Sequence, residues 1–558
     1  MNFQSDLVLI IDDSSMYRTA AKGMLQKLGF QVQNLHFAND AHEALQKART
    51  HAFQLVLCDY NLGEKANGYQ LIDQLQSQQL LPANCSLVIV TGDGTPDVVR
   101  GFAELEPDGY LLKPLNYVTL KERLPIFMHK KKSLSDMLLA LRKKDYPQVL
   151  ELVEQAYFRD SESTLLAQQI KTQAHIQMGD VDLAGNCLIS MINSDKSFAH
   201  YELAKISLKK RQFKEASYLL STLEKDATYK AKVSQLNSDI AIQLKDFQTA
   251  LEHSTIAVAC SPKVIQRHWQ KVYLELIGLE FGAALQSTKT MIGSAKFSFR
   301  ESTDMYLLGA SLLLDTAQVD PTKNLAQVAN WCEVWRKRFN QLDYKPFELL
   351  VFSRGYIIRN NLANAKQFIG DYEQYCVEHE NHIPSPLELV EQLKVYQLLK
   401  QNDKYQQVHV QLQDQWQATL DKGIHGHNEE GQAVLIQLQQ HALSQWRSRL
   451  QIQTQKLIEV KQQSHSLLKQ SHYEKAIHIL VEALPTSLND LEIPFLLMGA
   501  LTKSWPLGWN RRQVSELVMR CHAKLVGSSY EHNMEYRRIA LVLSKKLELT
   551  ELSIQHAS

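Results

Sequence analysis

The feature of this sequence that most restricts its fold is a repeat of 34 residues. An aromatic residue followed three positions later by alanine recurs at this period, as Phe213/Ala216, Phe247/Ala250 and Phe281/Ala284. Less regular copies of the pair are Tyr146/Val149, Val181/Ala184, Leu362/Ala365, Tyr405/Val408 and Tyr473/Ala476. A helix hairpin needs a small residue where its two helices approach and a large one near the turn. The repeat therefore predicts a stack of helix hairpins.

This pattern resembles the tetratricopeptide repeat over roughly residues 135–485. A further small residue precedes the aromatic position by nine residues in four copies, namely Ala204, Ser238, Ser353 and Ser464. The resemblance is degenerate, because the Trp, Leu and Gly expected early in the first helix are mostly absent, and the turn glycine survives only as Gly179. It implies an α-solenoid whose curved surface suits the binding of a peptide or helix.

The helical part is expected to fall into four segments. Tetratricopeptide-like repeats at 146–290 are followed by an irregular helical segment at 291–350, with a loop inserted at 315–324. Degenerate repeats at 351–485 include one long helix at about 429–470, and residues 486–558 form a helical cap. For the long helix, packing on neighbouring repeats is one interpretation and dimerisation through a coiled coil is the alternative.

Residues 1–127 follow a different periodicity. Short apolar runs alternate with amphipathic stretches, and the runs are Leu7–Ile11, Gln33–Phe37, Leu55–Cys58, Ser86–Val90 and Gly109–Leu112. This alternation predicts βα units on a parallel sheet. The chain is thus expected to combine an open, doubly wound α/β domain at 1–127 with an all-α region, joined by a linker and first helix at 128–145.

Polar residues stand where four of these runs end. Asp12 and Asp13 follow the first, Asp59 the third, Thr91-Gly92 the fourth and Lys113-Pro114 the fifth. The carboxyl ends of parallel strands meet at one edge of the sheet, where ligands bind. Three carboxylates crowded there repel one another unless a cation joins them, and Mg²⁺ prefers oxygen ligands. With a lysine and a threonine hydroxyl, such a site suits a phosphoryl group on an aspartate.

The ordered set resembles the CheY-like receiver domain of two-component response regulators, over about residues 5–127. The resemblance implies a flavodoxin-like (βα)5 fold in which Asp59 accepts the phosphoryl group and Thr91 and Lys113 contact it. The implied Mg²⁺ ligands are Asp12, Asp13, Asp59 and the backbone carbonyl of Asn61. The implied switch residues are Thr91, Tyr110 and Pro114, whose peptide bond is usually cis in the family. One departure is the loop at 60–68, which is a residue longer than the common pattern and lacks its usual proline.

Composition restricts where the chain works and what it binds. The net charge of +1 argues against nucleic acid as the partner, and no stretch approaches the roughly 18 apolar residues of a membrane helix. The seven cysteines are scattered without a CxxC pair, which indicates free thiols in a reducing compartment. We therefore expect a cytoplasmic protein without a nucleic-acid or membrane partner. His425-Gly426-His427 is interpreted as a solvated turn rather than a metal site.

The resemblances together predict a phosphorylation-controlled adaptor. The phosphodonor would be a sensor histidine kinase or a phosphotransfer protein, and the repeats would bind an unidentified protein client. The layout resembles VieB-type regulators, which implies a client kinase or regulator of the same pathway. No enzymatic motif is found, so the only chemistry expected is phosphoryl transfer to Asp59 and its autodephosphorylation. The alternatives are a helical region that binds RNA or DNA and a hidden enzymatic site.

Regulation is expected to act through a surface next to the linker. The face made by the fourth helix, fifth strand and fifth helix would change shape on phosphorylation. This face is predicted to dock on the repeats or on a second copy of the chain, which would make a homodimer.

Overall fold

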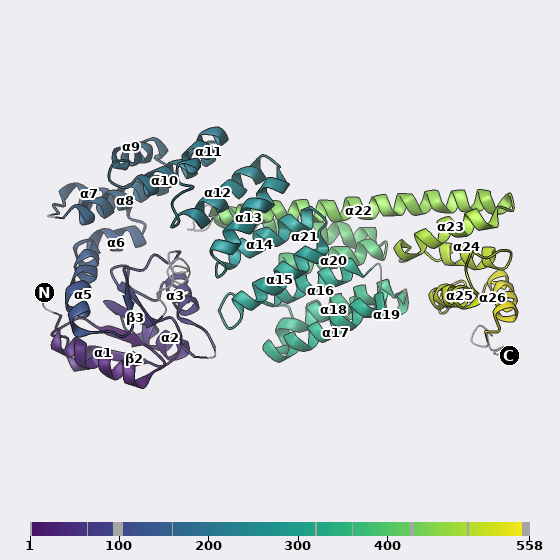
Figure 1. Cartoon of the computed structure of the whole chain (residues 1–558), viewed down its shortest axis with the longest axis horizontal. Coiled ribbons are helices and arrows are strands. Elements are labelled where there is room, and N and C mark those ends of the chain that lie inside the picture. The colour runs from purple at the N-terminus through teal and green to yellow at the C-terminus, as the bar shows by residue number, and fades with distance from the viewer. Residues whose placement is uncertain are drawn as a thin grey trace. The chain divides into compact units, whose positions relative to one another are not determined.

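The structure, a computed structural model, describes residues 3–549 apart from 64, 93–103, 159, 318–320, 360, 424–428 and 488–489 (Figure 1). It divides into two compact units. Unit 1 comprises Met1–Lys271 and Thr290–Glu301, and unit 2 comprises Val272–Lys289 and Ser302–Ser558. His425-Gly426-His427 and the expected position of the fourth helix, at 93–103, lie outside the described residues.

A five-stranded parallel sheet opens unit 1. Its strands are β1 (Val8–Ile11), β2 (Leu35–Ala38), β3 (Leu55–Asp59), β4 (Ser86–Thr91) and β5 (Gly109–Leu112). They are hydrogen-bonded in the order β2-β1-β3-β4-β5, with every pair parallel. The described helices around the sheet are α1 (Ser15–Lys27), α2 (Ala41–Thr50), α3 (Gly68–Ser77) and α5 (Tyr117–Ser133). The predicted doubly wound α/β domain is confirmed, and each strand lies within two residues of its predicted place.

The three central strands show why the sheet needs helices on both faces. Every residue of β1, β3 and β4 is buried. Alternate side chains enter two different cores, so that Leu9 and Val56 pack in one and Val8 and Leu55 in the other. Strands that are apolar on both faces are typical of parallel sheets covered on both sides. The parallel register then brings the carboxyl ends of β1, β3 and β4 to one edge.

Helices fill the rest of unit 1. They are α6 (Ser135–Arg142), α7 (Tyr146–Gln155), α8 (Ser161–Met178), α9 (Val181–Met191), α10 (Lys196–Lys209), α11 (Phe213–Ser221), α12 (Lys230–Gln243) and α13 (Phe247–Cys260). Helices α14 (Ile265–Ile277) and α15 (Phe281–Ala295) contribute residues to both units. Helix α5 continues past the sheet without a break, and Met128, inside the predicted linker, is buried in the core beside β1 and β4.

All the regular elements of unit 2 are helices, among the residues that the structure describes. Its helices after α15 are α16 (Thr303–Thr316), α17 (Pro321–Arg338), α18 (Gln341–Ile358), α19 (Leu362–Glu378), α20 (Pro386–Leu398), α21 (Asn402–Gly423), α22 (Glu429–Lys469), α23 (Tyr473–Ala483), α24 (Glu492–Leu501), α25 (Arg511–Leu525) and α26 (Met534–Leu547). The long helix predicted at about 429–470 is present as α22, a continuous helix of 41 residues (Figure 1). No described helix is both long and apolar enough to cross a membrane.

The loop predicted at 315–324 is wrong over most of its length. Asp315 and Thr316 belong to α16, and α17 begins at Pro321. Residues 318–320 lie outside the described part of the chain. Pro321 is compatible with the start of a helix, because the N–H that proline lacks has no partner within the helix at its first position.

The repeated residue pairs mark helix hairpins. Phe213, Phe247 and Phe281 are each the first residue of a helix, and Ala216, Ala250 and Ala284 are each 0% exposed. In two hairpins the earlier small residue closes the contact: Ser238 Oγ donates to the Ala250 carbonyl and Ser353 Oγ to the Ala365 carbonyl, both at 2.8 Å. The predicted all-α region of hairpins is confirmed, whereas its assignment as tetratricopeptide repeats stays a prediction.

The hairpin turns explain where the expected glycines went. Among the described residues, the residue two positions before the second helix has positive φ in seven turns, namely Lys144, Gly179, Arg211, Lys245, Leu279, Lys400 and Ser471. Only Gly179 among them is glycine. The left-handed conformation costs an L-residue about 1–2 kcal/mol. The turn geometry is therefore kept without the residue that suits it best, and glycine marks only one of these seven turns.

We expect Lys245→Gly to stabilise the protein. Lys245 has a φ of +61°, is exposed, and lies between α12 and α13. Glycine removes the conformational strain of about 1 kcal/mol, less the entropy that glycine loses on folding. The midpoint of urea unfolding, followed by circular dichroism, measures the gain. Leu244→Gly is the matched control, because Leu244 is right-handed with a φ of −80° and glycine there should destabilise. Equal shifts for both variants would contradict the strain argument.

Candidate functional site

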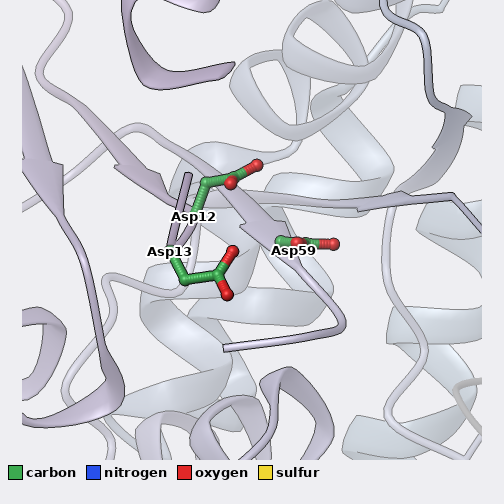
Figure 2. Close-up of side chains that lie close together, drawn as sticks. All are labelled: Asp12, Asp13 and Asp59. Carbon is green, nitrogen blue, oxygen red and sulfur yellow. The ribbon is translucent and has the colours of Figure 1, made fainter. Parts of the chain in front are cut away.

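The carboxyl edge of the sheet brings the predicted site residues together. Asp12 and Asp13 follow β1, and Asp59 is the last residue of β3. One carboxylate oxygen from each lies within 4.8 Å of the other two, and Figure 2 shows the three side chains gathered at the strand ends. Asp12 and Asp59 are each 5% exposed, whereas Asp13 is exposed. The site is thus an acidic pocket in which Asp12 and Asp59 are buried and Asp13 is exposed.

A single lysine joins the two buried carboxylates. Lys113, the residue after β5, places its Nζ 2.7 Å from Asp12 Oδ2 and 2.8 Å from Asp59 Oδ2. Burial opposes its charge, but the hydrogen bonds to both carboxylates win and raise the pKa of Lys113. Burial is also the main cause that raises the pKa of Asp59; Lys113 lowers that pKa, and the charge of Asp12 raises it. Asp59 is therefore a carboxylate held at some free-energy cost beside a fixed cation.

The donor set fits a divalent ion. Three carboxylates face one ammonium group, so the pocket carries an excess of negative charge. The backbone N–H of Asn61, two residues beyond Asp59, hydrogen-bonds the Asp59 carboxylate. That places Asn61, an exposed residue, at the rim of the same pocket. Clustered carboxylates with room for water and a phosphoryl oxygen are the ligands that Mg²⁺ takes.

The predicted switch residues lie on the neighbouring strands. Thr91 is the last residue of β4 and is 2% exposed. Tyr110 on β5 is half-buried and packs against the core, and burial raises its pKa to about 12. The Lys113–Pro114 peptide bond is cis. The structure thus places every predicted residue on the same edge of the sheet or next to it, while the individual roles stay predictions.

Two residues of α1 also shape the pocket and were not predicted. The Tyr17 ring lies under Lys113, with Nζ 4.3 Å from the ring centroid. Arg18 donates from Nη1 to the backbone carbonyls of Asp12 and Asp13. Their places in the sequence, four and five residues after Asp13, put them on the first turn of the following helix. This position could have predicted their place, because a residue in the first turn of a helix can lie against the strand end that precedes the helix.

The loop after Asp59 connects the pocket directly to α3. Gly68, the first residue of α3, donates its N–H to the Tyr60 carbonyl at 2.7 Å. A Cβ at Gly68 would lie 2.1 Å from the Asp59 carbonyl oxygen, so only glycine permits this approach. A shift of the Asp59 backbone therefore has to move the start of α3.

Helix α3 in turn holds the repeats of unit 1. Gln70 is 7% exposed and donates from Nε2 to the carbonyls of Ser294 and Lys296, at 3.2 and 3.1 Å. Arg300 forms a bidentate pair with Asp73, through Nε to Oδ2 and through Nη2 to Oδ1. We call these contacts of Gln70 and Asp73 with residues 294–300 the α3 clasp. The remaining oxygen of Gln70 caps α3 itself, accepting from the Asn67 N–H, so one side chain spans loop and repeats.

A second set of contacts comes from the segment before β5. Glu104 accepts from Arg267 Nη1 at 3.0 Å and from Ser261 Oγ at 3.3 Å. Glu106 pairs with Lys232 at 2.8 Å. The predicted docking face was the fourth helix, fifth strand and fifth helix. The fifth helix does contact the repeats, because Lys130 of α5 pairs with Glu162 of α8. Among described residues, further contacts with α12–α15 come from α3 and residues 104–106, where the acidic side chains that match Arg267, Lys232 and Arg300 lie.

Comparison with known proteins matches the N-terminal part. Residues 8–125 match the family model described as the response regulator receiver domain. The chain is 29% identical over 117 residues to the chemotaxis protein CheY-3 of Vibrio cholerae serotype O1, covering 21% of this chain and 87% of that protein. It is 26% identical over 123 residues to an uncharacterized response regulatory protein of Staphylococcus epidermidis, covering 22% and 47%. A structure of Vibrio cholerae CheY4 is 25% identical, covers 22% of this chain and 98% of its own, and gives a TM-score of 0.20.

Proposed function

We propose that this chain, whose residues 8–125 form a CheY-like response-regulator receiver domain, is a phosphorylation-controlled protein-binding adaptor. The observation that carries the proposal is the Lys113 bridge between Asp12 and Asp59 at the edge of the sheet. A fixed ammonium beside a carboxylate, with acids fitted to a divalent ion, is the chemistry that an acyl phosphate requires.

The reaction needs little from the protein beyond positioning and charge. An Asp59 oxygen attacks the phosphorus of a phosphohistidine or acyl phosphate; the new O–P bond forms as the bond to the leaving group breaks. Lys113 Nζ moves from carboxylate to phosphoryl oxygen, and the Thr91 hydroxyl donates to another. Mg²⁺, held by Asp12, Asp13, Asp59 and the Asn61 carbonyl, would neutralise phosphoryl charge when bound. Water returns Asp59 to the carboxylate, and the chain needs no other enzymatic activity.

The partners follow from the two parts of the chain. A sensor histidine kinase or phosphotransfer protein would supply the phosphoryl group in the cytoplasm, and the tetratricopeptide-like region would bind a protein client. The VieB-type layout supports a kinase or regulator of the same pathway as that client. The near-neutral charge, +1 over the chain, supports a protein rather than nucleic acid.

Control would pass through the α3 clasp. Phosphorylation displaces Lys113 and strains the loop that ends at Gly68, while Gln70 and Asp73 on the same helix hold residues 294–300. If the clasp and the phosphoryl group bias one another, the effect is reciprocal: loosening the clasp changes phosphoryl binding by the same factor. Couplings of this kind are typically about 5- to 150-fold.

Charge reversal at the clasp tests the proposal. We expect Asp73→Arg and Arg300→Asp each to change, at least about fivefold and in the same direction, the half-saturating concentration of beryllium fluoride with Mg²⁺. The double reversal should restore it to within about twofold. In the full chain, hydrogen exchange at residues 261–271 and 290–301 is measured as beryllium fluoride is added, and its change gives the half-saturating concentration. Asp136→Arg, which reverses an exposed acid elsewhere, is the control. Unchanged values in all variants would reject control through the clasp.

The adaptor part of the proposal has its own test. Proteins captured by the wild-type chain and by Asp59→Asn are quantified with acetyl phosphate and Mg²⁺ present. Phosphorylation control requires at least one partner whose captured amount differs between them. Identical capture would remove the switch from the proposal.

A further inference from the structure

The first half of α22 contacts helices that are far apart in the chain. Gln439 Nε2 donates to the Tyr273 hydroxyl of α14 at 3.0 Å, and Trp446 Nε1 donates to Asp315 Oδ1 of α16 at 3.2 Å. Gln439 also accepts from Trp416 Nε1 of α21 at 2.9 Å. In a stack of hairpins each repeat contacts only its neighbours. A helix that meets α14, α16 and α21 therefore lies across the stack and is not one of its layers.

The two halves of α22 belong to different cores of unit 2. In the first half, Ile436 and Leu443 pack in the cluster formed by α18–α21. In the second half, Leu457 and Val460 pack against the cluster formed by α23–α26. The two halves of α22 are therefore held by separate sets of contacts, and the second half has an anchor that does not depend on the first.

The surface that contacts Trp446, which we call the seat of α22, contains charged side chains. The indole N–H meets Asp315, and Lys394 Nζ lies 5.5 Å from the centroid of the ring. Lys394 pairs with Asp315 Oδ2 at 2.8 Å, and Arg354 pairs with Glu391 at 2.8 Å as well as with Asp315. The charges of these two acids and two bases sum to zero. The surface therefore suits an uncharged aromatic ring that carries an N–H donor better than it suits a further charged side chain.

The seat is incompletely filled. A cavity of about 50 Å³ lies beside Trp446, between apolar side chains of α16 and α20 that include Leu308, Leu312 and Val390. Close packing is the rule in protein interiors, and a lining without partner atoms loses dispersion contacts. An apolar group that entered this cavity would gain dispersion contacts that Trp446 and its neighbours leave unmade.

We infer that this surface of unit 2 binds an amphipathic helix of the client, and that residues 431–453 of α22 occupy its place in the free chain. The inference rests on the proposed adaptor function and gives the client a chemistry: a helix with apolar side chains at helical spacing and an aromatic donor over Asp315 and Lys394. Helix-in-groove recognition of this kind uses anchors three, four and seven residues apart. Leu443, Trp446 and Leu450 have this spacing in α22.

A labelled peptide of residues 431–453 is the probe. We expect it to bind the full-length Trp446→Ala chain at least about tenfold more tightly than the wild type, because the variant's own helix competes less well for the seat. The same peptide carrying Trp446→Ala should bind that variant at least about tenfold more weakly. Fluorescence anisotropy measures both. Gln445→Ala, an exposed neighbour on the same helix, is the matched control and should behave as wild type.

Three results would overturn the inference. They are equal binding of the peptide to wild type and Trp446→Ala, equal binding of the two peptides, and a Trp446→Ala chain that dimerises by exchanging α22, as seen by sedimentation velocity. If Trp446→Ala loses its circular dichroism signal, Gln439→Ala takes its place with the same expectations. No phosphodonor is present, so failure of the Asp59 switch leaves this measurement unaffected.

Discussion

Asp59→Asn should leave the chain folded and unable to take a phosphoryl group. The substitution keeps the size of the side chain and removes the nucleophilic oxygen, so acetyl phosphate with Mg²⁺ should modify the variant at least about a thousandfold more slowly than the wild type. Intact-protein mass measured over time counts the adduct. Asp40→Asn changes the acid that caps α2 and lies outside the cluster of Asp12, Asp13 and Asp59; it is the control and should be modified at the wild-type rate.

The same variant tests the electrostatics of the pocket. Burial first, and then the charge of Asp12, raises the pKa of Asp59, although Lys113 opposes both. Asparagine removes that cost and leaves Lys113 paired with Asp12, so its unfolding midpoint should equal or exceed that of the wild type. Lys113→Met does the reverse, because two buried carboxylates are left facing each other. Adduct at the wild-type rate on Asp59→Asn would assign the phosphoacceptor elsewhere.

Arg354→Met should be the most destabilising of the substitutions considered for unit 2. Arg354 is 2% exposed and pairs with both Asp315 and Glu391. Burial raises the pKa of Asp315, but the charges of Arg354 and Lys394 outweigh it and lower that pKa. Methionine leaves two buried carboxylates with only Lys394 between them. Removing one partner of a buried ion pair costs about 3–5 kcal/mol. The free energy of unfolding of unit 2 should fall by that amount.

Tryptophan fluorescence follows this loss during urea unfolding. Six of the seven tryptophans lie in unit 2, and Trp269 alone lies in unit 1. Lys404→Met is the control, because the Lys404–Glu373 pair is 46% and 35% exposed and should contribute less than about 1 kcal/mol. Equal shifts of the transition in the two variants would contradict the claim that Arg354 stabilises unit 2 by pairing with Asp315 and Glu391.

The sequence predicted those parts of the fold that depend on residues close to one another along the chain. Strand ends were located because Asp12, Asp59, Thr91 and Lys113 each stop an apolar run, and parallel strands bring such ends together. The hairpins were found because a close helix contact repeats the same two residue types every 34 positions. Both signals lie within one element or between neighbouring elements.

Contacts between distant residues were not predictable in this way. Asp73 and Arg300 are 227 residues apart, and Asp315 and Trp446 are 131 apart. Each of these residues, taken alone, has the sequence context of an ordinary surface or helix position. The loop expected at 315–324 failed for a related reason, since Asp315 faces Arg354 and Lys394 from inside a helix. The α3 clasp and the seat of α22 therefore came only from the structure.

Helix α5 has a consequence for how receivers of this kind can be exchanged between proteins. The core beside the sheet does not end at residue 127, because Met128, one turn after the buried Leu124 on the same helix, is 6% exposed and packs in it. A graft that stops at the apparent boundary would cut a helix and open that core. The transferable module therefore extends to Ser133, the last residue of α5. Only Leu134 separates α5 from α6, so a rotation of α5 about its axis would be passed to α6 through this one residue.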